Sequence, residues 1–206
     1  MSKYYSPLVT GVAFAAIFFT GCSENKPSEA ATASIIATEK PNFGGYESRV
    51  KWGEHLVTIA GCNDCHTPKK MTPMGPVDDS TLLLSGHPET MPAPDVDRKQ
   101  MESKGLVVTA TFTAWVGPWG ISYAANLTPD ETGIGNWKED QFLSAIRNSV
   151  SKGLAGSRPL MPPMSMMPFK HMSDEELKAV FAYLKTLKPI KNKSVQPTPP
   201  LLARNQ

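Results

Sequence analysis

The sequence is poor in the residues that several common functions require. Only three cysteines and four histidines occur in 206 residues. No second cysteine pair accompanies the first, which disfavours a four-ligand structural zinc site. Lysine and arginine form no run or stripe and the net charge is only +2, so nothing indicates nucleic-acid binding. The chain has no internal repeat, and about 150 residues of globular sequence predict a single domain.

Two of the three cysteines stand in the most specific pattern of the chain. Cys62 and Cys65 are followed directly by His66, which gives the C-x-x-C-H spacing of covalent c-type haem attachment. On a helical turn, thiols at i and i+3 lie on one side and can bond the two vinyl groups of one porphyrin. The histidine is then held under the iron as its proximal ligand. The pattern predicts one covalent haem c, with its iron bound by His66.

Three other uses of a Cys-x-x-Cys pair remain open. A thioredoxin-like redox site needs a strand–turn–helix setting and gains nothing from the histidine. Half of a zinc site would need further ligands elsewhere in the chain. The third use is a tight structural disulfide between the two cysteines.

The first residues of the chain predict export. Residues 1–21 have the features of a signal peptide, with Lys3 as its only charge and an apolar core of about a dozen residues that is short for a membrane span. The core ends at Gly21 and Cys22, which resembles a bacterial lipobox, so a lipid on Cys22 would anchor the chain to a membrane. An uncleaved anchor helix is the alternative. Export agrees with haem attachment, which bacteria complete outside the cytoplasm, and we expect the protein to face the periplasm or the cell exterior.

Composition divides the rest of the chain into three parts. Residues 22–42 are rich in Ser, Ala, Thr and Glu without a lasting period, which predicts a flexible tether. Residues 43–190 are expected to form the folded domain. Residues 191–206 are proline-rich and are expected to be a disordered tail.

Hydrophobic periodicity predicts three helices in the folded domain. The first covers residues 46–63 and carries the cysteine pair at its C-terminal end. The second begins at Asn136, because Asn136 and Glu139 have the spacing of a capping box, and it ends at Gly153. The third covers residues 173–187 and opens on a Ser-Asp-Glu-Glu capping box.

A long proline- and glycine-rich insertion, residues 67–135, separates the first two helices. Its β-branched stretch at residues 106–112 predicts a strand. Trp115 and Trp119 in the same insertion could form either a docking surface or a lid packed on the haem, and we favour the lid.

A haem held by one histidine needs either an open site or a sixth ligand. Four methionines lie among prolines in residues 158–168: Met161, Met164, Met166 and Met167. A thioether ligand raises the haem potential, which suits an electron carrier, and the prolines stiffen the loop. At most one methionine can bind the iron, so we favour Met164 and expect most of the others to fill the core. The remaining histidines are expected in surface or hydrogen-bonding roles: His55, His87 and His171.

Taken together, these features resemble a class I, monohaem cytochrome c. More closely, the chain resembles the cytochrome c domains of bacterial membrane-associated dehydrogenase cytochrome subunits and their periplasmic relatives. The likeness is carried by residues 62–68, 125–130 with 133–135, 137–146 and 162–187. The dehydrogenase subunits typically carry three haem motifs, whereas this chain has one, which limits it to single-electron transfer.

The resemblance implies an all-α cytochrome c fold in which the first and last helices cross. It implies His66 and Met164 as the iron ligands. It also implies a backbone carbonyl, assigned by spacing to Pro76, that accepts a hydrogen bond from the proximal imidazole. Trp137, Arg147 and residues 126–130 are candidates for contacts with the haem edge or propionates, with ordinary caps and packing as the alternative.

The predicted function is therefore a lipid-anchored electron carrier and not an enzyme, with no catalytic residue of its own. Its partners would be redox proteins: a dehydrogenase or quinol-oxidising complex on one side, and a terminal oxidase or reductase on the other. Two alternatives remain. One is a haem-based sensor of small ligands, and the other is an accessory haem subunit of a membrane dehydrogenase or oxidase complex.

Overall fold

The structure is a computed structural model that describes residues 42–201. The predicted signal peptide (residues 1–21) and nearly all of the predicted tether (residues 22–42) lie outside the described residues. Within residues 42–201, no helix is long and apolar enough to cross a membrane.

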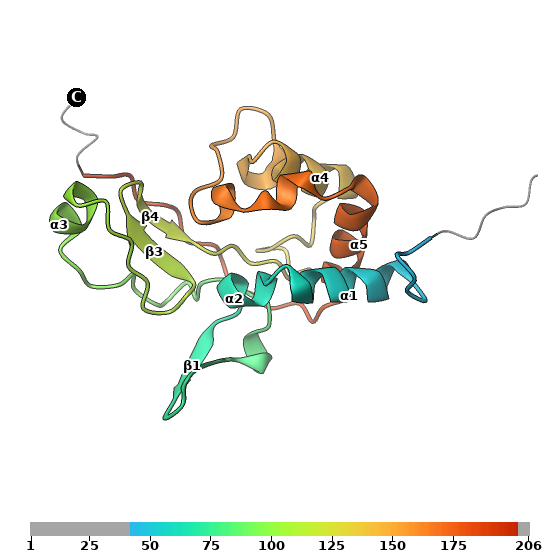
Figure 1. Cartoon of the computed structure of the whole chain (residues 1–206), viewed down its shortest axis with the longest axis horizontal. Helices are drawn as coiled ribbons and strands as arrows, with labels where there is room; N and C mark the ends of the chain where they lie inside the picture. The colour runs from blue at the N-terminus through green and yellow to red at the C-terminus, as the bar shows by residue number, and fades with distance from the viewer. Residues whose placement is uncertain (1–41, 202–206) are drawn as a thin grey trace, which may run out of the picture. The chain divides into compact units, whose positions relative to one another are not determined.

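Helices and two small hairpins make up the described chain (Figure 1). The α-helices are α1 (Arg49–Ile59), α2 (Cys62–His66), α3 (Arg98–Ser103), α4 (Glu139–Arg147) and α5 (Asp174–Leu184). The antiparallel hairpins are β1 (Lys69–Thr72) with β2 (Gly75–Asp78), and β3 (Ala114–Gly117) with β4 (Gly120–Tyr123). Single 3₁₀ turns are η1 (Ser80–Leu82), η2 (Ser151–Gly153), η3 (Met164–Met166) and η4 (Pro168–His171).

Helices α1 and α5 cross, as the resemblance implies, and their contact forms the centre of the core. The crossing is close because Gly53 of α1 lies against the backbone of α5, where a Cβ atom would overlap the carbonyl oxygen of Ala179. Helix α4 packs on the same core through Phe142, whose ring lies 5.3 Å from that of Phe181. The buried apolar cluster consists of Leu56, Val57, Leu84, Ile134, Phe142, Ala179, Val180, Phe181 and Leu184.

The helix ends agree in part with the sequence-based prediction. The capping box at the start of α5 is confirmed, because Ser173 and Glu176 exchange side-chain-to-backbone hydrogen bonds. The capping box predicted at Asn136 is wrong: α4 is capped by Lys138 without a side-chain bond. Residues 133–137 instead form turns closed by hydrogen bonds such as that from Trp137 N to Ile134 O, which delay the helix.

The predicted fold class holds in part: the core is helical, but the insertion adds two small antiparallel hairpins to it. A strand was expected at residues 106–112, but there Val108 forms only an isolated bridge with Val116. The strands form later, in β3 and β4, where Gly117 faces Gly120 across a tight turn and Gly120 adopts φ +96°. Hairpin β3–β4 lies beside α3, whereas hairpin β1–β2 projects from the body next to α2 (Figure 1).

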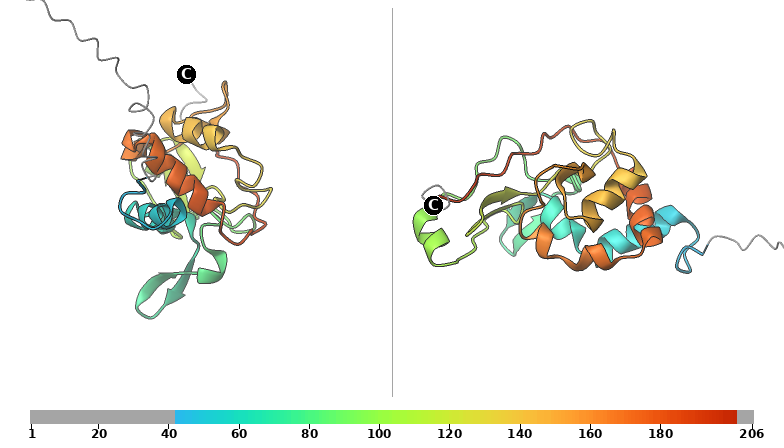
Figure 2. Two further views of the ribbon diagram at one scale, coloured as in Figure 1. Left: turned by 90° about the vertical axis from the view of Figure 1, so that its right-hand side faces the viewer. Right: turned by 90° about the horizontal axis from the view of Figure 1, so that it is seen from above.

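The proline-rich segment after the last helix is also ordered, as far as residue 201. We call residues 191–201 the strap. It runs along β4, where Thr198 and Ile121 exchange two backbone hydrogen bonds of 2.8 and 2.9 Å, towards α3 (Figure 2). Near its end, Leu201 N donates to the Glu102 carboxylate at 2.7 Å. The prediction of a disordered tail is therefore wrong for residues 191–201, because these residues find hydrogen-bonding partners in the insertion.

Candidate haem site

A break in the first predicted helix sets the position of the cysteine pair. Helix α1 ends at Ile59, and Gly61 then adopts the left-handed conformation with φ +65° before α2 begins at Cys62. Glycine adopts this conformation without steric cost. Helix α2 is therefore a separate short turn, and it carries Cys62, Cys65 and His66 together.

All three of these side chains line a cavity of about 460 Å³. The volume falls within the range of about 300–1,000 Å³ that is usual for ligand and cofactor sites. Its walls come from the end of α1, α2, hairpin β3–β4, helices α4 and α5, the methionine-rich segment and residues 193–197 of the strap. Much of the lining is apolar, including Phe142, Leu177 and Val180, so the site suits a large, flat hydrophobic group.

The thiols of the cysteine pair are protonated at neutral pH. Burial raises the pKa of Cys62 to about 11, with a further contribution from the neighbouring Cys65. Burial, followed by the charge of Asp64, also raises the pKa of Cys65. Neither cysteine is in a disulfide. A thioredoxin-like site needs a thiol whose pKa is lowered, so this environment disfavours that use of the pair.

His66 is oriented by a backbone carbonyl. Its Nδ1 lies 2.8 Å from the carbonyl oxygen of Ala125. A carbonyl can only accept, so Nδ1 carries the proton and Nε2 is the ring nitrogen with a free lone pair. Burial lowers the pKa of His66, and the hydrogen bond to Ala125 partly opposes that shift. The ring is thus neutral and suited to bind iron.

The expected acceptor for this hydrogen bond was Pro76, and that assignment is wrong. Pro76 lies in strand β2, where it is opposite Met71 in the β1–β2 hairpin. The acceptor Ala125 belongs to a segment that carries the family resemblance, but spacing from the histidine gave no reason to select it. His66 and Ala125 are 59 residues apart in the sequence, and no local sequence signal reveals a contact over that separation.

The methionine-rich segment faces the haem site with three of its four candidates. Met161, Met164 and Met167 line the cavity, whereas Met166 does not and is 75% exposed. Hairpin β3–β4 holds the segment in place, because the Ser122 hydroxyl donates to the carbonyl of Pro162. Sequence analysis did not single out a fourth methionine in the lining, Met172, which lies just before α5.

Cationic side chains predominate among the charged residues of the lining. Lys152, Arg158 and Lys193 line the cavity together with a single acid, Glu131. Partial burial lowers the pKa of Arg158. The positive excess favours a ligand that carries negative groups.

Residues predicted at the haem edge have different positions. Trp137 and Asn126 line the cavity, and so does Trp115 of the insertion. Arg147 does not: it donates to the carbonyl of Lys170 and pairs with Asp174 at 2.7 Å. Arg147 therefore links α4 to the start of α5.

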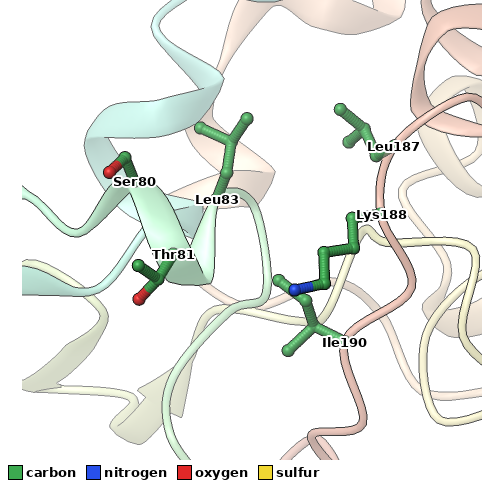
Figure 3. Close-up of a pocket in the computed structure, with 6 residues that line it drawn as sticks. All are labelled: Ser80, Thr81, Leu83, Leu187, Lys188 and Ile190. Carbon is green, nitrogen blue, oxygen red and sulfur yellow. The ribbon is translucent and has the colours of Figure 1, made fainter.

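A second, much smaller cavity of about 110 Å³ lies between the η1 turn and residues 187–190 (Figure 3). It shares no lining residue with the haem cavity. Its six lining residues are Ser80, Thr81, Leu83, Leu187, Lys188 and Ile190. A cavity of this size is too small for a porphyrin.

Comparison with known proteins identifies the family. Residues 50–188 match the family model for cytochrome c, which is most of the described chain. The chain belongs to the cytochrome c family. Membership implies covalently bound haem c with its iron, and the residues that line the cavity fit that group.

Several relatives are cytochrome subunits of bacterial dehydrogenases. The gluconate 2-dehydrogenase cytochrome c subunit of Pantoea cypripedii is 40% identical over 138 residues, which is 66% of this chain and 23% of the relative. The fructose dehydrogenase cytochrome subunit of Gluconobacter japonicus is 26% identical over 155 residues, 74% of this chain and 24% of the relative. The corresponding subunit of the quinone-dependent alcohol dehydrogenase of Gluconobacter oxydans is 28% identical over 138 residues and matches 21% of its own length. This chain therefore spans less than a quarter of each relative.

Proposed function

We propose that the chain is a monohaem electron carrier whose haem is bonded by Cys62 and Cys65 and ligated by His66 and Met164. The observation that carries the proposal is the meeting of two thiols, a neutral imidazole and the methionine-rich segment in one cavity. When bound, haem supplies one-electron Fe(III)/Fe(II) chemistry. In this role the chain holds the haem, excludes water from it and sets its reduction potential.

Different residues at the cavity orient the iron ligands and pair with the charged groups of the haem. Ala125 fixes the orientation of the His66 ring, and Ser122 restrains the methionine-rich segment. Both restraints act through backbone carbonyls, so they hold the ligands without adding charge to the cavity. Arg158, Lys152 and Lys193 are suited to pair with haem propionates, because a charged hydrogen bond is about twice as strong as a neutral one.

Removal of both thiols tests the proposal directly. The double variant Cys62→Ala with Cys65→Ala should lose haem staining on a denaturing gel, whereas the wild-type protein should keep it. Staining that persists in the variant would overturn the whole assignment. Optical redox potentiometry on the wild-type protein then measures whether the iron cycles reversibly by one electron.

Addition of carbon monoxide to the reduced protein separates the carrier from the ligand sensor. A carrier with both axial positions filled should show no spectral change. A rapid shift of the absorption spectrum would favour the sensor, since the gas would need an open or labile axial position.

The relatives support a dehydrogenase as the electron donor. We propose a periplasmic dehydrogenase or quinol-oxidising complex as donor, and an oxidase or reductase as acceptor. An accessory subunit that stays in such a complex is the second candidate, since the relatives carry the names of complex subunits. Purification under mild detergent distinguishes them, because an accessory subunit should elute with a dehydrogenase and a free carrier should elute alone.

A further inference from the structure

Three segments that are far apart in the sequence meet beside His66. They are residues 85–87, residues 124–126 and the first part of the strap. Gly86 N donates to His66 O at 2.7 Å, and His87 N donates to Ala124 O at 3.0 Å. Gly86 has φ +80°, and a Cβ atom there would come within 2.5 Å of the carbonyl carbon of Ala125. The carbonyl that orients His66 is thus closely packed on one side by residues 85–87.

The strap supports the same carbonyl from another side through Asn126. The buried Asn126 amide donates to Asn192 O in the strap at 3.2 Å, and to Ile190 O, one residue before the strap, at 2.8 Å. Asn126 N, which belongs to the same peptide group as the Ala125 carbonyl, faces the Ser194 hydroxyl at 3.3 Å. The orientation of that peptide group therefore depends on the position of the strap.

Asn192 joins all three segments. Its side-chain amide donates to Ser85 O at 2.6 Å and to His87 O at 2.9 Å, and its carbonyl oxygen accepts from Glu89 N at 2.9 Å. Its side chain is buried and both of its polar atoms are used. Removal of the side chain would leave two carbonyls of the 85–87 segment without their partner, which is costly for buried groups.

We propose that Asn192 is a positioning residue for the proximal haem ligand. It ties the strap to residues 85–87, and these two elements hold the 125–126 peptide group at the distance that lets Ala125 accept from His66 Nδ1. A hydrogen bond at Nδ1 raises the basicity of a ligating imidazole and stabilises the oxidised metal. The strap therefore lowers the reduction potential of the haem, in addition to forming part of the cavity wall. This inference rests on the proposed ligation of iron by His66.

The experiment compares wild-type holoprotein with Asn192→Ala and with a control in the strap, Thr198→Ala. Thr198 pairs with Ile121 through its backbone alone, so the control keeps the strap's hydrogen bonds. We expect Asn192→Ala to raise the reduction potential, and we expect the control to match the wild type. Proton NMR of the reduced protein should show the His66 Nδ1 proton shifted upfield and exchanging faster with solvent in Asn192→Ala only.

A milder variant keeps the test decisive if Asn192→Ala fails to accumulate. Ser194→Ala removes one acceptor beside the 125–126 peptide group and should move the potential and the Nδ1 proton in the same directions, by less. A potential and an Nδ1 proton that stay at the wild-type values in every variant that folds with haem would overturn the positioning role. Absence of covalent haem from the wild-type protein would instead contradict the proposed function, so the two failures are distinguishable.

Discussion

At the scale of single residues, the structure separates side chains that share a sequence environment. Four methionines occur within seven residues, yet Met166 is exposed and does not line the cavity, while Met161, Met164 and Met167 line it. In the same way, Arg147 was a candidate for the haem edge but pairs with Asp174, and Arg158 lines the cavity instead. A pattern of residue types can therefore predict which segment forms the site, whereas the path of the backbone decides which of its side chains line the cavity.

Replacement of Met164 by alanine should remove the sixth iron ligand. We expect the methionine-to-iron charge-transfer band at the red end of the oxidised spectrum to disappear and the reduced protein to bind carbon monoxide. Met166→Ala is the matched control, since Met166 is 75% exposed, and it should leave both properties unchanged. If the band survives in Met164→Ala, the ligand is Met161, Met167 or Met172.

His87 should make the stability of the protein depend on pH. Its Nε2 donates to the Met91 carbonyl and its Nδ1 accepts from Thr113, and burial lowers its pKa from the ordinary 6.5. Above pH 6.5 the ring is neutral whether the chain is folded or not. As pH falls below that value the unfolded chain binds a proton more readily than the folded one, so stability is lost.

Urea unfolding of the holoprotein at about pH 7.5 and about pH 5.5 measures the effect. The decrease in unfolding free energy from the higher pH to the lower pH should be smaller in His87→Gln than in the wild type. His171→Gln, at an exposed histidine, is the control and should behave like the wild type. Equal losses in all three proteins would show that His87 does not take part.

At the scale of secondary structure, the elements that hold the haem site are not the helices that form the core. Helices α1 and α5 form the core, but the ligand segments are held by hairpin β3–β4 and the strap. Trp119 Nε1 donates to the Ser122 hydroxyl at 3.1 Å, and that hydroxyl in turn donates to Pro162. The insertion thus acts on the haem site through hydrogen bonds as well as by covering it with Trp115.

Gly53→Ala should weaken the crossing of α1 and α5. The new Cβ atom would meet the Ala179 carbonyl, and backbone on both sides would have to move. Although alanine is the better helix former, we expect a net loss of about 1–3 kcal/mol in unfolding free energy, the usual cost of overpacking. Thr58→Ala, on the exposed face of the same helix, should change it by no more than about 0.5 kcal/mol. Chemical denaturation of both variants provides the comparison.

Local sequence signals predicted the helical core and part of the haem site. They failed for features that depend on contacts between residues far apart in the sequence. Helical periodicity and the Ser173 capping box act within a few residues, so the start of α5 could be read directly. The acceptor Ala125 and the ordered strap depend on partners 59 to 107 residues away. The proline-rich composition of residues 191–201 predicted disorder. Composition carries no information about a distant partner that can form hydrogen bonds with their backbone groups, so the prediction failed.

At the scale of the whole molecule, the described domain is one part of a chain that we propose to be membrane-anchored. The proposed anchor, Cys22, lies outside the described residues. Cys22→Ala should move the protein from the membrane fraction to the soluble periplasmic fraction, while haem staining stays unchanged. Ser23→Ala, one residue further on, should keep the protein on the membrane. Continued membrane association of Cys22→Ala would count against the lipid and favour an uncleaved helix.

The strap also has a consequence for the order in which the protein matures. It follows every other element of the domain in the chain, and the hydrogen bonds of Asn192 to residues 85 and 126 close loops of 107 and 66 residues. Contacts of such long range form late in folding. We therefore expect the part of the cavity wall that the strap forms to close last during biogenesis, so the thiols stay accessible to the haem-attachment machinery until the cofactor is in place.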